Sequence, residues 1–305
     1  MNIFLSGANG MVGQNILQNT KSKNYNFIAP PKKSLNLLKT DEIHHFFQKH
    51  SIDLVIHAAG IVGGIEANIS NPSRYLLDNT QMGINLINVC KKNKIKNLIN
   101  LASSCMYPKD SNEPLTENMI LSGPLEPTNE GYALAKILVT RLCEYISFDK
   151  KNFSYKTVIP CNLYGEFDKF DPIKGHFVGA LIEKISEAKK NKKNSITLFG
   201  DGTPYRQFMH AKDLAIIIKE MILKDKFYNM NIATEENYTI DTIAKLALRA
   251  CNCENIEINY DTSKPNGQMR KDIQTSRLKK YFPDFKPIKL EKGIGEIYKK
   301  RFILK

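Results

Sequence analysis

The first third of the chain alternates short apolar runs with segments whose apolar residues recur at helical spacing. The apolar runs predict four strands, at Asn2–Ser6, Asn26–Ala29, Leu54–Ala59 and Asn97–Ala102. The helically spaced segments between them predict helices at Met11–Asn19, Asp41–Lys49 and Leu77–Lys92. A further helix at Tyr132–Tyr145 and a fifth strand at Tyr155–Pro160 continue the series. This alternation predicts an α/β fold with a doubly wound parallel sheet.

The pattern loosens after about residue 165, where loops rich in Asp, Pro and Gly appear at Asp168–Gly175 and Gly200–Pro204. We therefore expect two domains. The first covers residues 1–165, and later segments, roughly 196–235, return to it. Residues 166–305 form mainly a smaller, interleaved α/β domain.

Composition narrows the class of protein. The 305 residues are 42% hydrophobic and 25% charged, which is close to the globular average and argues against disorder. No run of 18 uncharged apolar residues predicts a membrane helix, and the N-terminus lacks the basic region of a signal peptide. Six cysteines without a C-x-x-C pair predict neither a metal site nor disulfides, so a cytoplasmic protein is expected. The net charge of +13 permits an anionic partner without identifying it.

The loop after the first strand has the sequence G-x-x-G-x-x-G. Gly7 permits a tight turn, Gly10 a close approach of backbone to a pyrophosphate, and Gly13 close packing of helix on strand. Met11 and Val12 begin the following helix, whose N-terminal N–H groups favour an anion. Because the motif joins the first strand and helix of the alternation, it predicts a Rossmann-type dinucleotide site.

The region after the second strand indicates which dinucleotide is bound. NAD-binding sites usually place a carboxylate there, on the ribose 2′-hydroxyl. This chain has no acidic residue between Gln14 and Thr40, but it has Lys32 just beyond the strand. A lysine attracts a 2′-phosphate, so NADP is favoured as the cofactor.

A Ser–Tyr–Lys set predicts carbonyl reduction. Tyr132 and Lys136 form a Y-x-x-x-K pair on one face of a helix. We expect the ammonium to lower the pKa of the phenol and make it a proton donor to a substrate carbonyl. Ser103, at the end of the fourth strand, is expected to hydrogen-bond the same oxygen, since open α/β sheets bind ligands at the carboxyl ends of their strands.

At this level of detail the chain resembles the extended short-chain dehydrogenase/reductase family, and within it the GDP-L-fucose synthases. The resemblance runs through nearly the whole chain in order. It is carried by GANGMVG (7–13), HAAGIVGGIEAN (57–68), ASSCMYP (102–108), EPTNEGYALAK (126–136), IPCNLYG (159–165), GTPYRQFMHAKDL (202–214) and KPNG (264–267). It implies a nicotinamide domain, a smaller substrate domain and a homodimer. The implied substrate is a GDP-4-keto-6-deoxy sugar.

The resemblance also implies residue roles. Ser103, Tyr132 and Lys136 would form the reductase triad, and Cys105 and His176 the acid/base pair that epimerises C3 and C5. Further cofactor contacts would come from the glycine loop residues Gly7, Gly10, Met11, Val12 and Gly13, and from Lys32, Ala58 and Ala59. Substrate contacts would come from Asn162, Lys184, Arg206 and Lys271. The chemistry is consistent, because a C4 ketone acidifies both flanking C–H groups, and Cys and His exchange protons near pH 7.

Three departures from the family pattern concern binding. Ala8-Asn9 stands where His-Arg is common, and Pro30-Pro31-Lys32 stands where Arg-Thr-Arg is common. Both changes touch the 2′-phosphate pocket. Lys184 occupies a position where arginine is usual.

Other functions remain open at this point. One is a C4-reductase without epimerase activity, acting on a related GDP-4-keto-6-deoxy-heptose or 3,6-dideoxy sugar; Cys105 and His176 argue against it. A 4,6-dehydratase would need an acidic pair where this chain has Ser104-Cys105. A non-enzymatic Rossmann protein, regulatory or nucleic-acid-binding, would not need the Tyr–Lys pair. We expect no nucleic-acid or membrane partner, since no nucleic-acid-binding motif is present.

Overall fold

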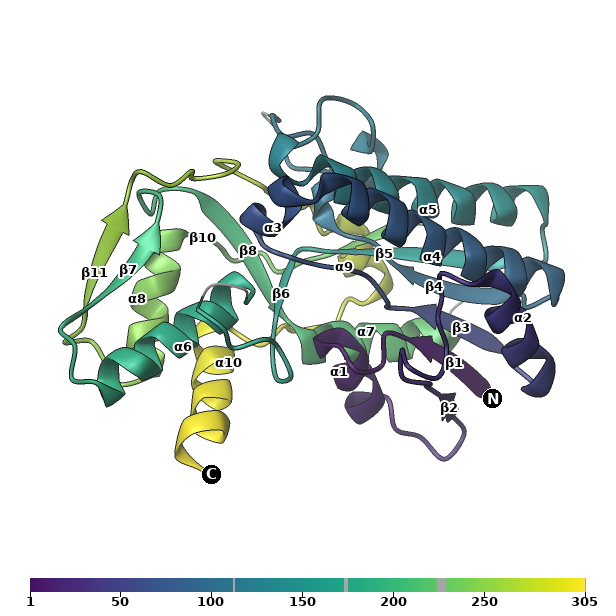
Figure 1. Cartoon of the computed structure of the whole chain (residues 1–305), viewed down its shortest axis with the longest axis horizontal. Coiled ribbons are helices and arrows are strands. Elements are labelled where there is room, and N and C mark those ends of the chain that lie inside the picture. The colour runs from purple at the N-terminus through teal and green to yellow at the C-terminus, as the bar shows by residue number, and fades with distance from the viewer. Residues whose placement is uncertain (112, 173–174, 224–228, 305) are drawn as a thin grey trace.

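A six-stranded parallel sheet organises the larger part of the molecule (Figure 1). The computed structural model describes residues 1–111, 113–172, 175–223 and 229–304. The strand order is β2-β1-β3-β4-β5-β9, and every neighbouring pair is parallel. The strands are β1 (Asn2–Ser6), β2 (Asn26–Ile28), β3 (Leu54–His57), β4 (Asn97–Leu101), β5 (Ser154–Pro160) and β9 (Asn229–Ile232). The predicted doubly wound parallel sheet is confirmed.

Helices cover both faces of this sheet because alternate strand residues point to opposite sides. Ile3 and Leu5 of β1 lie in one buried cluster with Ile16, whereas Phe4 packs in another with Leu86. Figure 1 shows the corresponding layers. One face carries α1 (Met11–Asn19) and α7 (Ala211–Leu223); the other carries α2 (Thr40–Lys49), α4 (Pro72–Lys92) and α5 (Glu130–Asp149).

A smaller region with its own buried core lies beside the large sheet. It contains a three-stranded sheet of order β10-β8-β6 and a parallel pair β11-β7. Its strands are β6 (Asn162–Tyr164), β7 (Ser195–Phe199), β8 (Tyr205–His210), β10 (Asn237–Thr239) and β11 (Glu257–Asp261). Its helices α6 (Phe177–Lys190), α8 (Ile240–Ala250) and α10 (Leu290–Tyr298) pack around Tyr164 and Ile243. Two short helices, α3 (Ile65–Ser70) and α9 (Ser276–Tyr281), complete the list of α-helices in the described ranges.

The later segment that belongs to the large sheet is shorter than the expected 196–235. Helix α7 and strand β9 rejoin the large sheet, but β7 and β8, also within 196–235, belong to the smaller sheets. The side chains of β7 alternate between buried and exposed, as on a strand covered on one side only, whereas β3 is buried throughout. Residues 224–228 of this segment, and residues 173–174 of the predicted loop 168–175, lie outside the described residues.

Among the described residues, no helix is both long enough and apolar enough to cross a membrane.

Candidate active site

The glycine loop is packed as its sequence predicts. Gly7 has a φ of +73°, and a Cβ there would lie 2.6 Å from the Ala59 nitrogen and 2.7 Å from Ala58 backbone atoms. A Cβ on Gly13 would lie 2.2 Å from the Gly7 oxygen, so helix α1 starts directly against the loop. Gly10 precedes α1 in an extended conformation, and its N–H donates to the Gly7 oxygen at 3.0 Å. The structure therefore brings the loop and Ala58-Ala59 together.

The other predicted cofactor residues lie on the same edge of the large sheet. Met11 and Val12 are the first two residues of α1, where no acidic side chain occupies the first turn. Lys32 is exposed in the turn after β2, in which the Ser34 N–H donates to the Pro31 oxygen at 2.8 Å. No carboxylate lies near this exposed lysine in the sequence, so its positive charge suits an anionic ligand.

The Ser–Tyr–Lys set converges where β4 ends. Ser103 begins the short 3₁₀ turn η1 (Ser104–Met106), and its Oγ accepts from the Cys105 N–H at 3.4 Å. The Ser103 side chain also hydrogen-bonds the side chains of Tyr132 and Cys105. Lys136, one helical turn from Tyr132 on α5, donates to the Leu101 oxygen at 2.7 Å. Its Nζ lies 5.7 Å from the centroid of the Tyr132 ring.

Burial controls the proton affinities of this set. It raises the pKa of Tyr132 above its ordinary value, with a smaller rise from the neighbouring Cys105, while the Ser103 hydrogen bond lowers it. Burial also lowers the pKa of Lys136 to about 8. The expected lowering of the Tyr132 pKa is therefore not met, because burial outweighs the interactions that favour the phenolate. The physical reason is that both groups are withdrawn from water and the ammonium points to the Leu101 carbonyl.

Cys105 is buried beside this set and is influenced by two lysines. Burial raises the pKa of its thiol, whereas the Ser103 hydrogen bond, Lys271 and Lys136 lower it, in that order of size. Cys105 is therefore held as a thiol, and its conversion to a thiolate depends on nearby positive charge.

Lys271, whose charge lowers the pKa of Cys105, lies on a segment that is held against Leu115 of the larger region. Leu115 anchors this segment: its N–H donates to the Asp272 oxygen at 2.6 Å, and its oxygen accepts from the Gln274 N–H at 3.0 Å. The buried amide of Gln207 on β8 adds a second anchor, because its Oε1 accepts from the Ile273 N–H at 2.7 Å.

Glu126 links two of the predicted substrate residues. Burial lowers the pKa values of Arg206 and Lys271, and the charge of Glu126 raises both. Gly267 of the KPNG segment packs on the same arginine, since a Cβ there would lie 3.5 Å from Arg206 Nη2. The structure thus joins Arg206 and Lys271 to the Cys105 centre.

His176 is held by Asp168 rather than by the residues around Cys105. It precedes α6, and its Nδ1 lies 2.7 Å from Oδ1 of Asp168. The Asp168 hydrogen bond raises the pKa of His176, and burial opposes this rise. Within the described ranges, the interactions that join Ser103, Tyr132 and Cys105 do not include His176.

The remaining substrate candidates lie on the smaller region. Asn162 on β6 donates to the Gln207 oxygen at 3.1 Å. Lys184 on α6 donates to the Thr197 oxygen at 2.8 Å, and burial lowers its pKa. Its Nζ lies 5.4 Å from the centroid of the Phe199 ring, and Lys264 Nζ lies 5.6 Å from the same centroid.

Sequence reasoning missed three residues of this site. Phe199 is 57% exposed between two lysines, and its position directly before the G-D-G-T-P loop was the available signal. Glu126 begins the EPTNEGYALAK segment, and its position in that motif was the available signal. Asp168 had no signal beyond its position in an Asp-rich loop.

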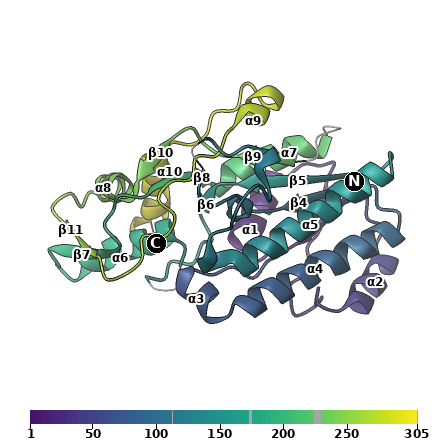
Figure 2. The same ribbon diagram turned by 90° about the horizontal axis from the view of Figure 1, so that it is seen from above.

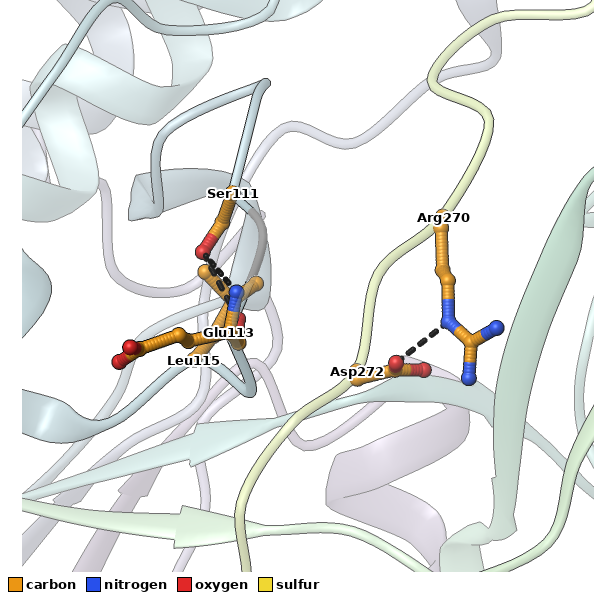
Figure 3. Close-up of a pocket in the computed structure, with 5 residues that line it drawn as sticks. All are labelled: Ser111, Glu113, Leu115, Arg270 and Asp272. Atoms are coloured by element: carbon orange, nitrogen blue, oxygen red, sulfur yellow. Dashed lines mark hydrogen bonds and ion pairs between the residues drawn. The ribbon is translucent and has the colours of Figure 1, made fainter.

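A cavity of about 370 Å³ lies next to the Lys271 segment (Figure 3). Its lining residues are Ser111, Glu113, Leu115, Arg270 and Asp272. Arg270 pairs with Asp272 at 2.5 Å, as Figure 3 shows. Neither Lys271, between them in sequence, nor any of the predicted catalytic residues is among the residues that line this cavity.

Comparison with known proteins places these features in context. Residues 3–233 match the model of the NAD dependent epimerase/dehydratase family. The chain is 48% identical over 298 residues to GDP-L-colitose synthase of Yersinia pseudotuberculosis, covering 97% of this chain and 96% of the relative. It is 40% identical over 279 residues to GDP-L-fucose synthase of Azorhizobium caulinodans, covering 90% of this chain and 88% of that protein.

The fold agrees with these sequence matches. The crystal structure of a GDP-L-fucose synthetase from Naegleria fowleri bound to NADP superimposes with a TM-score of 0.88 at 25% identity. The superposition covers 98% of this chain and 92% of the other.

Proposed function

We propose a specific reaction for this chain, which belongs to the NAD-dependent epimerase/dehydratase family. The protein is an NADPH-dependent epimerase-reductase that acts on a GDP-4-keto-6-deoxy sugar. The observation that carries the proposal is the convergence of Ser103, Tyr132 and Lys136 with Cys105 at the end of β4. Relatives at 48% and 40% identity, named GDP-L-colitose synthase and GDP-L-fucose synthase, support the substrate class.

The reductase half of the reaction uses the tyrosine. The Ser103 hydroxyl and the Tyr132 phenol both donate to the C4 oxygen and hold the ketone in place. NADPH, when bound, supplies the hydride that reduces C4. Tyr132 gives its proton to the forming alkoxide, after which the Ser103 hydroxyl turns from the C4 oxygen to donate to the phenolate. The Lys136 ammonium, 5.7 Å from the ring centroid, adds positive charge beside that anion.

The epimerase half uses the thiol and the imidazole. The polarised C4 ketone makes the hydrogens on C3 and C5 acidic. Cys105, as thiolate, removes a proton from one face, and the electron pair moves into an enolate on the C4 oxygen. His176, as imidazolium, returns a proton to the same carbon from the other face. Lys271 lowers the pKa of Cys105 against the larger effect of burial, and Asp168 raises the pKa of His176, so both charges act in the direction that the step requires.

NADP fits the cofactor site in this chain. The glycine loop presents the N-terminus of α1 to a pyrophosphate, and Gly7 packs on Ala58-Ala59. Lys32 supplies positive charge for a 2′-phosphate, and no acidic residue between 14 and 40 opposes it. The Naegleria structure, which has NADP bound, supports this assignment.

The nucleotide diphosphate would be held by the smaller region. Arg206 offers a planar pair of donors to a diphosphate, and Lys271 adds charge at the sugar end. Phe199 presents an exposed ring between Lys184 and Lys264, which suits stacking on a base. Asn162 completes the set through an amide anchored to β8.

A second candidate substrate is the corresponding 3,6-dideoxy sugar. The 48% identity to a GDP-L-colitose synthase, against 40% to a GDP-L-fucose synthase, favours it. Such a substrate has no C3 stereocentre, so Cys105 and His176 would act at C5 alone.

NMR identification of the product tests the proposal. The protein is incubated with NADPH and either GDP-4-keto-6-deoxy-mannose or its 3-deoxy counterpart, in heavy water. We expect a C4-reduced sugar with deuterium at C5, and at C3 as well for the first substrate. Failure of both substrates to oxidise NADPH would refute the reductase assignment.

A tyrosine variant links that activity to the site. We predict that Tyr132→Phe reduces the NADPH oxidation rate by about 100-fold or more, because the proton donor is lost. Tyr25→Phe, which changes a tyrosine in the loop before β2, serves as the matched control and keeps the wild-type rate. Equal rates in the two variants would contradict the role of Tyr132.

We further propose that the protein acts as a homodimer through helix α5. Leu134, Leu138, Tyr145 and Phe148 form an exposed apolar stripe along one face of that helix. Figure 2 shows α5 running beside α4 along one side of the molecule. A second copy would cover this stripe.

We also propose that the reaction takes place in the cytoplasm. All six cysteines are free and buried, which fits a reducing compartment.

A further inference from the structure

A buried carboxylate supports the exposed histidine of the site. The side chain of Asp168 is 2% exposed, whereas that of His176 is 43% exposed. Asp168 Oδ1 lies 2.7 Å from His176 Nδ1 and also accepts from the Lys169 N–H at 2.8 Å. Its other oxygen, Oδ2, is buried and has no hydrogen-bond partner in the described part of the chain. The carboxylate therefore has one side-chain partner here, the imidazole.

This contact determines which nitrogen of the ring is available. An ionised carboxylate only accepts hydrogen bonds, so Nδ1 must carry a proton and donate to Asp168. In the neutral ring Nε2 then has a free lone pair, and in the imidazolium Nε2 carries the exchangeable proton. Either way, proton exchange with a substrate is restricted to Nε2.

We propose that Asp168 is a positioning residue for the epimerase half-reaction: it fixes the ring of His176 and assigns the Nδ1–H tautomer, which leaves Nε2 as the atom that exchanges protons. The inference rests on the proposed function for the role of His176, but not for the hydrogen bond itself. When Nε2 gives its proton to the enolate carbon, the ring becomes neutral and keeps Nδ1–H on Asp168. Water then reprotonates Nε2 before the next turnover.

The charges around the pair support this arrangement. The Asp168 carboxylate lies by the first turn of α6, because a Cβ on Gly179 would be 3.2 Å from Oδ2, and a helix N-terminus stabilises an anion. Lys169 opposes the protonated ring, but its effect is smaller than that of Asp168. Farther along α6, Glu183 is paired with Arg301 of the C-terminal turn, at 3.6 Å.

The loop that carries the pair is braced from two sides. The Arg301 guanidinium lies 4.2 Å from the centroid of the Phe170 ring. Lys300 pairs with Glu166 at 2.5 Å, and the backbone oxygen of Glu166 accepts from Asn15 of α1 at 3.0 Å. These contacts hold Asp168 near His176 without entering the hydrogen bond between them.

NMR titration of the histidines in the full chain tests the inference. The imidazole signals of wild type and Asp168→Asn are followed from pH 5 to 9, with His176→Asn used to assign the resonance. We expect His176 to titrate at lower pH in Asp168→Asn than in wild type, because the carboxylate that favours its charged form is gone. Glu187→Gln, which removes an exposed carboxylate farther along α6, leaves the titration unchanged. A His176 titration unaffected by Asp168→Asn would overturn the inference.

A measurement on the wild type needs no variant. The ¹⁵N shifts of His176 at high pH should report a protonated Nδ1 and an unprotonated Nε2. The opposite tautomer would overturn the inference even if Asp168→Asn did not fold.

Deuterium exchange separates the inference from the proposed function. In Asp168→Asn we expect exchange at C5 to fall about tenfold or more at neutral pH, and its pH profile to move the same way as the titration. If the titration moves but exchange does not, the catalytic part of the inference is overturned. Continued NADPH oxidation in that variant would show that the proposed reductase function stands regardless.

Discussion

Cys105 illustrates how single residues are tuned in this site. Burial alone would leave it an inert thiol, as it does for Cys161, whose pKa burial raises to about 12. What distinguishes Cys105 is the hydrogen bond from Ser103 and the charges of Lys271 and Lys136. One of these charges comes from the smaller region, so the reactivity of the thiol depends on the segment that carries Lys271.

We therefore predict that Lys271→Met slows the alkylation of Cys105 by iodoacetamide. Lys271 lowers the thiol pKa, so its removal raises that pKa and reduces the thiolate fraction at any given pH. The rate profile should move to higher pH. Peptide mass spectrometry distinguishes Cys105 from the five other cysteines.

The control for this experiment is Lys264→Met, which removes an exposed charge of the KPNG segment that pairs with Glu66. It should leave the Cys105 profile unchanged. Identical shifts in both variants would mean that net charge, rather than Lys271, controls the thiol.

At the residue scale the sequence was a good guide to chemistry and a poor guide to tuning. The convergence of Ser103, Tyr132 and Lys136 was predictable because helical spacing places Tyr132 and Lys136 on one face, and because Ser103 ends a strand. The direction of the tyrosine pKa was not, since it depends on burial. Asp168 and Glu126 were also unpredictable, because their partners in the fold lie outside their own motif.

At the element scale, the glycines of the loop between β1 and α1 serve two different purposes: one is needed for the fold and another for cofactor binding. Gly13 is required by the fold itself, because its missing Cβ makes room for the backbone of Gly7 and Ala8. Gly10 is not, since the nearest atom to a Cβ there is the Gly7 oxygen at 3.4 Å.

Two alanine variants should therefore behave differently. Gly10→Ala is expected to leave the melting temperature unchanged but to weaken NADPH binding about tenfold or more, because its methyl group lies where a pyrophosphate approaches. Gly13→Ala is expected to lower the melting temperature and NADPH affinity together. Calorimetry and fluorescence titration give the two values. If Gly10→Ala bound NADPH normally, the pyrophosphate would not lie against this loop.

The elements themselves were predictable to different degrees. The buried strands of the large sheet are continuous apolar runs between turn residues, so β1, β3, β4 and β5 match expectation within two residues. Helix α4 begins five residues earlier than predicted, since Pro72 is well suited to the first turn of a helix. Helix α3 is only six residues long and has too little periodicity to detect. The short strands of the smaller region pair across long stretches of chain, which local pattern does not encode.

On the scale of the whole molecule, the apolar stripe on α5 has a measurable consequence. Phe148 is 81% exposed at its end, and Leu138 lies near its middle. If the wild type is the proposed dimer, we predict that Leu138→Glu is a monomer in sedimentation velocity, because a charge would be buried in the interface.

Ile216→Glu is the matched control, since it places the same charge on an exposed position of α7. It should remain dimeric. A monomeric wild type at micromolar concentration would refute the dimer.

The order in which the two regions are synthesised determines when the nascent chain is incompletely folded. Strand β9 is an edge of the large sheet, yet it follows β5 by roughly 70 residues, most of which belong to the smaller region. A ribosome adding about 5–20 residues per second needs several seconds to supply them. Throughout that interval β5 presents an unpaired edge, and α1 lacks α7 beside it until α7 is synthesised shortly before β9. The nascent chain is thus most exposed to aggregation midway through translation, and binding of NADP to the already synthesised glycine loop would stabilise it before synthesis ends.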